Sequence, residues 1–541
     1  MIFIVTFSVL ANSSNLNIPC IAGSGVDYPV GPGQTFANIS DVPWSSLGAG
    51  DTVRIHYQPS PYKEKIIIST SGTELNPIRI CGVAGTNGER PILDGDGATN
   101  DPDDSAAYGT YAPMEGLALI MIYNNDFTTK VNNITIDGLH IKNAKNTFSY
   151  TRVNGNSSTY ENGAACIRVQ AGDNITIRDN EIENCGSGIF TMSQGYNEES
   201  LTRNILIEGN YIHNHGQSGS YLHHGLYIQA IGATYQYNRF GPMATGSQAV
   251  TLKERVAGSV IRYNWFDAGS NARFLDLVEV EDASAWYIVS EYLAELGCID
   301  VNNCPSIDPN RLQKVQEAED MYRQTFVYGN FFDHIGSMTD AGNIVHYGWD
   351  NDIALAREGT LYFYHNSISI QQNLSDGWRF RLFDMRNDFD GSPVSNETIE
   401  VFNNIIYFRS EVIGQDPAYF CMSNNGGTVN FGVNWISNYN QSDSLANCYY
   451  NDPNNEPTLN GLTNLIDGTN SPAPLTPLLQ TVNTPLVIGN AQILLPPANP
   501  VNYEYMPHQK RKNRLSTNDL GAMEISATLP DIIFINGFES L

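Results

Sequence analysis

Lys253 and Arg255 stand two positions apart, a type and spacing of residues that can do proton-transfer chemistry. Side chains at positions i and i+2 of a strand point to the same face, so these two cations are neighbours in an extended segment. A positive neighbour disfavours the charged form of a lysine and lowers its pKa. Because a lysine with a lowered pKa can accept a proton near neutral pH, Lys253 is predicted to act as a general base.

More basic side chains follow this pair along the chain. Arg273 comes twenty residues after Lys253, within stacking reach if the chain forms coils, and His346 and Arg381 come in later coils. In a chain with only 29 basic residues, this grouping indicates a basic lane that binds an anion. The alternative is an ordinary solvated surface, on which Lys253-Glu254-Arg255 is simply a cluster of charges.

A group of carboxylates, Asp276, Glu279, Glu281 and Asp282, is the second candidate for chemistry. Carboxylate oxygens are preferred ligands of Ca²⁺, which makes Glu279, Glu281 and Asp282 candidate metal ligands. A carboxyl pair at about 5–5.5 or 6.5–9.5 Å could instead hydrolyse a glycosidic bond. The third interpretation is a solvated acidic loop.

A repeated pattern in the chain predicts the elements that position these residues. It reads apolar, any, apolar, two residues, Asn, any, apolar, and its asparagines are Asn180, Asn210, Asn238, Asn264, Asn330, Asn366 and Asn404. The alternating apolar positions are typical of strands, and the Asn belongs at a turn, where it tolerates left-handed geometry and can hydrogen-bond along a stack. The spacing predicts an all-β, right-handed parallel β-helix rather than a propeller, which repeats at about 40–50 residues, or a sandwich.

A second strand is predicted in each coil and carries the candidate residues. In 226–229, 250–253 and 275–278, Leu, Ile or Val alternates with polar residues, so Tyr227, Gln229, Thr251, Lys253 and Asp276 are predicted to point outward. Stacked strands are about 4.8 Å apart, so these outward residues form a ladder along which a long polymer can lie. The predicted substrate-binding residues are Arg255, Tyr227, Gln229, Asp276, His346 and Arg381.

The repeat also suggests the organisation of the chain. Residues 1–13 resemble the apolar region of a signal segment, and residues 14–410 form the β-helix. Residues 282–324 are predicted to be a helical insertion, with helices over 283–296 and 309–321. Residues 411–541 are predicted to hold the final coils, an irregular segment that wraps the outside, and a tail.

Composition bounds the partners and the compartment. The 541 residues carry a net charge of −28, which argues against bulk binding of nucleic acid or of an anionic membrane, and no apolar run is long enough to span a bilayer. The eight cysteines are predicted to pair as nearest neighbours, as expected of a secreted protein in the periplasm or outside the cell. The pairs are Cys20–Cys81, Cys166–Cys185, Cys298–Cys304 and Cys421–Cys448. A monomer is favoured.

The stretch Gln248-Ala-Val-Thr-Leu-Lys253, the coil 259–266 and Arg273 resemble polysaccharide lyase family six, which contains alginate lyases and chondroitinase B. In that family, a Lys and an Arg on successive coils carry the chemistry. The family commonly places acidic Ca²⁺ ligands just before the Lys, where this chain has Gly246 and Gln248, and Arg273 is followed by Phe274 rather than a His. The segment 518–524 is similar to the closing motif of many exported bacterial β-helix proteins, which implies a bacterial source.

The resemblance implies β-elimination on an acidic polysaccharide that contains uronic acid. Lys253 would take the C5 proton, Arg273 would stabilise the developing charge or assist the leaving O4, and Arg255 or Arg381 would neutralise the carboxylate. Two other functions remain open at this point. They are a glycoside hydrolase that uses carboxylates such as Asp276, Glu279, Asp340 or Asp350, and a non-catalytic carbohydrate-binding or cell-surface protein.

Overall fold

The structure is a computed structural model. It describes residues 14–15, 18–125, 129–193, 197–267, 273–336, 343–372, 380–385, 396–410, 420–437, 458–468, 486–507 and 509–524. The signal segment predicted for residues 1–13 and the predicted tail at the end of the chain lie outside the described residues.

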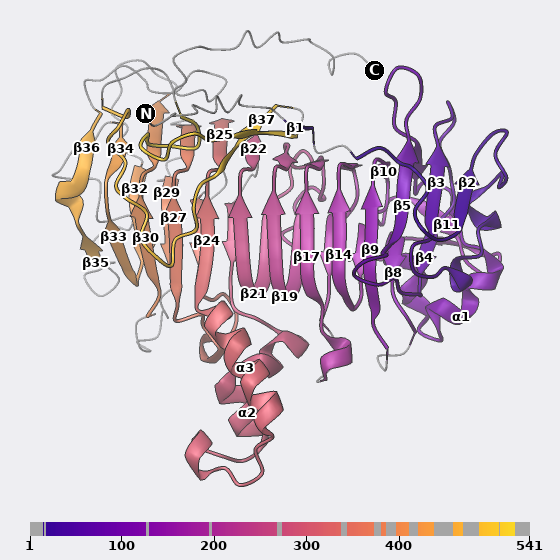
Figure 1. Ribbon diagram of the computed structural model, residues 1–541, viewed down its shortest axis with the longest axis horizontal. Coiled ribbons are helices and arrows are strands. Elements are labelled where there is room, and N and C mark those ends of the chain that lie inside the picture. The colour runs from indigo at the N-terminus through magenta and orange to yellow at the C-terminus, as the bar shows by residue number, and fades with distance from the viewer. Residues whose placement is uncertain are drawn as a thin grey trace, which may run out of the picture.

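The chain forms a right-handed parallel β-helix, as predicted, and its coils run along the long axis of the molecule (Figure 1). The coils contribute strands to three parallel strips, which we number in the order in which the chain passes through them within a central coil. Two long strands, β19 (Leu226–Gln236) and β21 (Leu252–Arg262), run through the first and the second strip without a break. The sequence predicted separate strands here.

The remaining strands fall into the three strips. The first strip contains β4 (Ile66–Ile68), β8 (Ala118–Ile122), β13 (Ala165–Val169), β16 (Ser187–Thr191), β23 (Arg273–Leu277), β26 (Asn343–Tyr347), β29 (Phe380–Met385) and β32 (Phe420–Asn425). The second contains β2 (Asp27–Val30), β3 (Thr52–His56), β5 (Ile78–Val83), β9 (Val131–Asp137), β14 (Gly172–Arg178), β17 (Arg203–Glu208), β24 (Gln324–Tyr328), β27 (Thr360–Tyr364), β30 (Thr398–Phe402), β33 (Thr428–Phe431) and β35 (Thr458–Asn460). The third contains β6 (Ile92–Asp94), β10 (His140–Lys142), β15 (Glu181–Glu183), β18 (Tyr211–His213), β20 (Arg239–Phe240), β22 (Trp265–Asp267), β25 (Phe331–Gly336), β28 (Ser367–Gln372), β31 (Ile405–Ser410), β34 (Asn434–Ile436) and β36 (Leu465–Asp467).

The predicted asparagine stack lies at the turn between the second and third strips. The Asn264 amide donates to the Asn330 Oδ1 at 3.0 Å, and the Asn238 amide donates to the Asn264 Oδ1 at 3.0 Å. The left-handed residue, however, is the one before each Asn, as Tyr237 (φ 57°) and Tyr263 (φ 56°) show. The stack therefore satisfies buried turn groups from coil to coil, while a neighbour adopts the strained backbone conformation.

The interior of the solenoid is apolar, as the alternation predicts. Leu226, Leu252 and Leu275 are fully buried in one continuous core, and Phe266 stacks between Phe240 and Phe332 at centroid distances of 4.6 and 4.7 Å. Each coil buries these side chains against its neighbours, which is how a solenoid gains stability.

The helical insertion leaves the solenoid after the first-strip strand of its central coil and projects from it (Figure 1). It consists of a 3₁₀ segment (Asp282–Tyr287), α2 (Val289–Glu295) and α3 (Pro309–Tyr322). Tyr287, Tyr322 and Ala257 belong to the apolar cluster between the insertion and the second strip. The insertion is thus packed on the coil that carries Lys253 rather than tethered loosely to it.

Several short elements lie outside the coils. Residues 486–507 cover a column of stacked tyrosines, where the Tyr364 hydroxyl donates to the Asn499 carbonyl at 2.9 Å. The remaining elements are β1 (Ser14–Asn15), β37 (Tyr503–Met506) and β38 (Lys510–Asn513) in one small sheet, β7 (Ala98–Thr99), β11 (Ser149–Thr151) and β12 (Ser157–Thr159) in another, and α1 (Ser105–Tyr108). Among the described residues, no helix is long and apolar enough to cross a bilayer.

Three of the four predicted disulfides are confirmed. Cys20–Cys81, Cys166–Cys185 and Cys298–Cys304 are bonded. Cys448, the predicted partner of Cys421, lies outside the described residues.

Candidate functional site

The outward positions of the first strip form the predicted ladder. Tyr227, Lys253, Asp276 and His346 are direct partners on successive strands β19, β21, β23 and β26. Their side chains face away from the core but are largely covered by one another and by the loop after β26; Lys253 is 9% exposed and Asp276 is 2% exposed. The geometry of the ladder is therefore as predicted, while most of its central part is covered.

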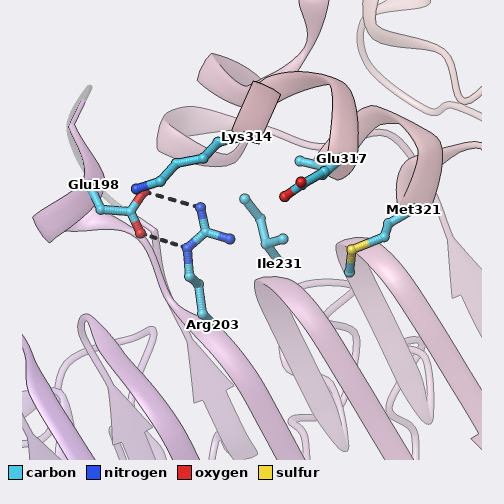
Figure 2. Close-up of a pocket in the computed structure, with 7 residues that line it drawn as sticks. Glu198, Arg203, Ile231, Lys314, Glu317 and Met321 are labelled. Atoms are coloured by element: carbon cyan, nitrogen blue, oxygen red, sulfur yellow. Dashed lines mark hydrogen bonds and ion pairs between the residues drawn. The ribbon is translucent and has the colours of Figure 1, made fainter. Parts of the chain in front are cut away.

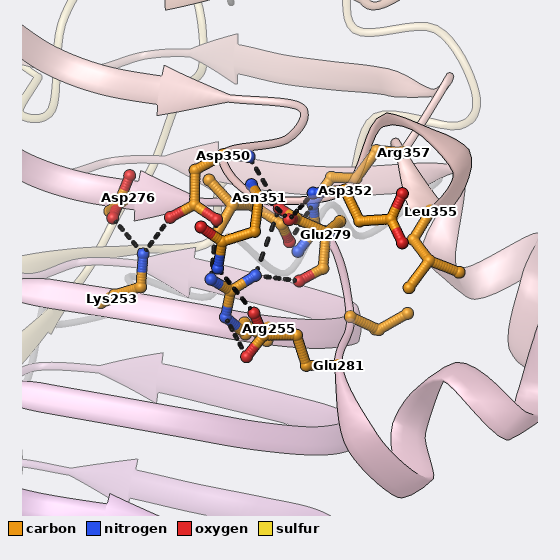
Figure 3. A network of polar contacts seen from close by, with 12 residues as sticks. Lys253, Arg255, Asp276, Glu279, Glu281, Asp350, Asn351, Asp352, Leu355 and Arg357 are labelled. Carbon is orange, nitrogen blue, oxygen red and sulfur yellow. Dashed lines mark hydrogen bonds and ion pairs between the residues drawn. The ribbon is translucent and has the colours of Figure 1, made fainter.

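Lys253 is held between two carboxylates (Figure 3). Its Nζ donates to Asp276 Oδ2 at 2.7 Å and to Asp350 Oδ2 at 2.6 Å. Burial opposes the charged ammonium, but the attraction of Asp276 and Asp350 outweighs it and raises the lysine pKa. Arg255 does lower the pKa of Lys253, as predicted, but the two carboxylates outweigh it. The predicted net lowering is therefore wrong, because the sequence did not show that Asp350 returns to this position from a later coil.

Arg255 lies on the same face as Lys253, as predicted, and is 2% exposed. Its guanidinium reaches Asp350 at 2.7 Å, Glu281 at 3.0 Å and Glu279 at 3.2 Å (Figure 3). The Arg255 Nε also donates to the Tyr227 hydroxyl at 3.1 Å. Burial disfavours the charged guanidinium and lowers its pKa, but Tyr227 and these carboxylates outweigh burial and raise the pKa above its ordinary value. The donors of Arg255 are thus committed to groups of the protein.

Glu279 holds the loop after β26 in place. Its carboxylate is fully buried and accepts from the backbone N–H groups of Asp350, Asn351 and Asp352 at 2.8, 2.7 and 2.9 Å. This contact explains how Asp350 comes to lie beside Lys253, since movement of the loop would leave the buried Glu279 carboxylate without three of its hydrogen-bond donors.

Carboxylate oxygens of Glu279, Glu281 and Asp350 lie within 4.8 Å of one another. Two of the predicted calcium ligands, Glu279 and Glu281, belong to this group, whereas the third, Asp282, accepts a 3.4 Å hydrogen bond from Gln229. The guanidinium of Arg255 pairs with all three carboxylates of the group, so a bound cation would compete with Arg255 for them. Calcium binding stays a prediction, and no step below uses it.

Arg273 and Lys253 meet on one carboxylate. The Arg273 Nη1 donates to Asp276 Oδ1 at 2.9 Å, and His346 Nδ1 lies 2.6 Å from the same oxygen. Burial would raise the pKa of Asp276, but Lys253 and Arg273 hold it well below its usual range. The Arg273 side chain is 24% exposed, against 11% for Lys253 and 2% for Arg255, which makes it the most accessible of these three cations.

Two other predicted substrate-binding residues lie at the edges of this group. Gln229 is 2% exposed and accepts from the Ser193 N–H at 3.1 Å. Arg381, paired with Asp384 at 3.3 Å, follows Arg273 and Asn343 along one row of the first strip. Gln229 shares the face of Lys253, since it is the direct partner of Arg255, whereas Arg381 lies two strands beyond Arg273 in the first strip.

The sequence reasoning missed an ion pair inside the solenoid. Glu254 is fully buried, where it accepts from the Ser259 hydroxyl at 2.8 Å and lies 3.9 Å from Arg357. Alternation along β21 places Glu254 inward between Lys253 and Arg255, so Lys253-Glu254-Arg255 is not a surface charge cluster. The strand alternation was the signal that could have shown this.

We call the row of Tyr227, Lys253, Asp276 and His346 the Lys253 ladder. A cavity of about 250 Å³ lies away from this ladder, between α3 and the second strip. Figure 2 shows Glu198 and Arg203 on its wall, joined by an ion pair of 2.6 Å, with Lys314, Glu317 and Met321 from α3 facing them. None of the predicted site residues lines this cavity.

The chain matches one family model and several solved structures. Residues 106–272 match the family model described as "Right handed beta helix region". Among solved structures, an alginate lyase from Paenibacillus sp. str. FPU-7 is 12% identical, with 69% of this chain and 92% of that chain covered and a TM-score of 0.38. Pectate lyase Pel9A is 11% identical over 92% of this chain and 96% of its own (TM-score 0.38). The Streptococcus pneumoniae surface protein and adhesin PfbA is 10% identical over 77% and 91% (TM-score 0.35). No curated protein sequence matches this chain.

Proposed function

We propose that this protein is a secreted polysaccharide lyase that cleaves a uronic-acid-containing polysaccharide by β-elimination. The observation that carries the proposal is the meeting of Lys253 and Arg273 on the carboxylate of Asp276, on the outer face of the central coils. The disulfides fit an oxidising, exported environment. Family six of the polysaccharide lyases is the family that the Lys253–Arg273 spacing resembles.

In the proposed reaction, the neutral amine of Lys253 takes the C5 proton of a uronate. The C–H electron pair becomes the C4–C5 double bond, and the C4–O4 bond breaks so that O4 leaves with a proton from water. Arg273, the most accessible of the three cations, pairs with the substrate carboxylate and stabilises the charge that develops on it. Because Asp276 and Asp350 raise the pKa of Lys253, the reaction is expected to be faster at alkaline pH.

A specific observation favours a second function, non-catalytic binding of a carbohydrate. Lys253, Arg255 and Arg273 each contact a carboxylate of the protein, and a lysine fixed in its charged form is not a base. Hydrolysis has less support, because the cations keep the pKa values of Asp276 and Asp350 low and neither can donate a proton near neutral pH. Asp340, which we also considered for hydrolysis, lies outside the described residues.

The test is a panel of alginate, polygalacturonate, chondroitin and dermatan sulfate, each incubated with the protein at neutral and alkaline pH. We expect the ultraviolet absorbance of an unsaturated uronate to rise on at least one polymer. New reducing ends without that absorbance would indicate a hydrolase. Binding without either signal, on protein shown to be folded by circular dichroism, would indicate the non-catalytic function.

A further inference from the structure

The Lys253 ladder continues toward the N-terminus through two residues that the sequence reasoning did not select. Arg168 on β13 is the direct partner of Phe190 on β16, and Phe190 is the direct partner of Tyr227 on β19. With Lys253 next to Tyr227, the row reads guanidinium, ring, ring, ammonium. At about 4.8 Å for each strand, Arg168 lies about 14 Å from Lys253, a span that a short oligosaccharide bridges.

Arg168 differs from the other cations of this row because none of the described carboxylates pairs with it. Its Nε donates to Gln170 Oε1 at 2.8 Å, its Nη2 lies 3.2 Å from the Met192 sulfur, and its guanidinium carbon lies 4.2 Å from the centre of the Phe190 ring. The residue is 6% exposed, and burial lowers the arginine pKa to about 10. A buried cation without a counter-charge costs folding free energy, which a bound anion would recover.

Two aromatic rings lie beside Arg168 in the same row. Phe190 and Tyr227 are both half-buried, and they meet edge to face at a centroid distance of 4.9 Å. Half-buried rings in a row offer apolar area to the C–H face of a saccharide, while the guanidinium offers paired donors to a carboxylate or a sulfate.

We propose that Arg168, with Phe190 and Tyr227, forms an anion-binding subsite for an acidic polysaccharide, three strands away from Lys253. The inference rests on the proposed function, because it takes the Lys253 ladder as the face that binds the polymer. It adds that the polymer is charged at a sugar remote from the reaction site, and that this charge is bound by an arginine that pairs with none of the described carboxylates.

The experiment measures the affinity of Arg168→Met, Arg168→Lys and the full wild-type chain for acidic oligosaccharides by calorimetry. Oligogalacturonate presents carboxylates, and chondroitin sulfate compared with its desulfated form separates a sulfate from a carboxylate. We expect Arg168→Met to bind the preferred acidic ligand about 10- to 100-fold more weakly, and Arg168→Lys to lie between it and wild type. Neutral dextran oligosaccharides control for changes that are not electrostatic.

Arg178→Met is the matched control, since Arg178 lies on the second strip and pairs with Asp137 at 3.2 Å. Equal losses in Arg168→Met and Arg178→Met would show a bulk charge effect and overturn the subsite, as would wild-type affinity in Arg168→Met. A fall in the melting temperature of Arg168→Met with no specific loss of acidic ligand would show a structural role and also overturn it. If wild type yields no unsaturated product but Arg168→Met still loses affinity, the lyase fails and the subsite stands.

Discussion

Arg255 and Arg168 are both outward arginines of the first strip and both are nearly buried, yet their surroundings are opposite. Arg255 contacts three carboxylates, from the segment after β23 and from the loop after β26. Arg168 has a glutamine oxygen, a sulfur and an aromatic ring. The first arginine is satisfied within the protein and holds a loop in place, whereas the second keeps its charge for a partner outside the protein.

The largest expected effect is on the free energy of unfolding, which should fall much more when Arg255 is removed than when Arg168 is removed. Arg255→Met removes the guanidinium that pairs with Glu279, Glu281 and Asp350, and of these Asp350 keeps its ion pair with Lys253. We therefore expect a loss of about 3–5 kcal/mol in the free energy of unfolding. Arg168→Met removes a charge with which no carboxylate of the described segments pairs, together with a ring contact, so the change in the free energy of unfolding should stay within about 1 kcal/mol. Urea unfolding of both variants measures these changes. Equal losses in the free energy of unfolding would contradict the claim that the two arginines have opposite surroundings.

The pH dependence of stability gives the next largest effect. The pKa of Asp276 is lower in the folded protein than in the unfolded chain, so its contribution is complete above the unfolded value of about 3.9 and is lost as the pH falls toward the folded value. Asp276→Asn should therefore be less stable than wild type by about 2–3 kcal/mol at pH 7, and the gap should narrow below about pH 4. Melting temperatures across that range test this. A stability difference between Asp276→Asn and wild type that is the same at pH 3 and pH 7 would contradict a lowered pKa of Asp276 in the folded protein.

A smaller effect is expected on the rate of elimination. Asp350 contributes to raising the pKa of Lys253, so Asp350→Asn should lower that pKa and shift the rising limb of the pH–rate profile to lower pH by about one unit, or about 1.4 kcal/mol. The profile of kcat/KM for both proteins measures the shift. An unmoved limb would mean that Lys253 is not the group that titrates.

The smallest effect is expected from the partner of Arg168. Gln170→Met removes the oxygen that accepts from the Arg168 Nε but leaves the charge, so acidic oligosaccharides should bind about 2- to 5-fold more weakly. Calorimetry on the same ligands, with Arg178→Met as the control, checks this. A loss of affinity as large as that of Arg168→Met would mean that the Gln170 amide, rather than the Arg168 guanidinium, binds the anion.

The fold and the ladder could be predicted because they depend on local periodicity. The alternation and the asparagine spacing predicted the coils, and they placed Tyr227, Lys253 and Asp276 on one row. Charge pairing could not be predicted in the same way. Asp350 reaches Lys253 from 97 residues away because a buried Glu279 holds its loop, and a repeat pattern carries no trace of that contact.

The Arg168 subsite could not be predicted from the sequence either. Its distinguishing feature is the lack of a carboxylate partner among the described residues, and a missing contact leaves no signal in one sequence. Glu254 is the intermediate case, because strand alternation could have shown that it lies inside, whereas its charge suggested the surface.

The most direct test of the central claim compares wild type, Lys253→Met and Lys142→Met on the polymer that wild type depolymerises. Lys142 lies on β10 in the third strip, away from the ladder, and controls for loss of a lysine. The account predicts an unsaturated product from wild type and Lys142→Met, and none from Lys253→Met, with all three proteins folded and binding the polymer. Unchanged product formation by Lys253→Met would contradict it.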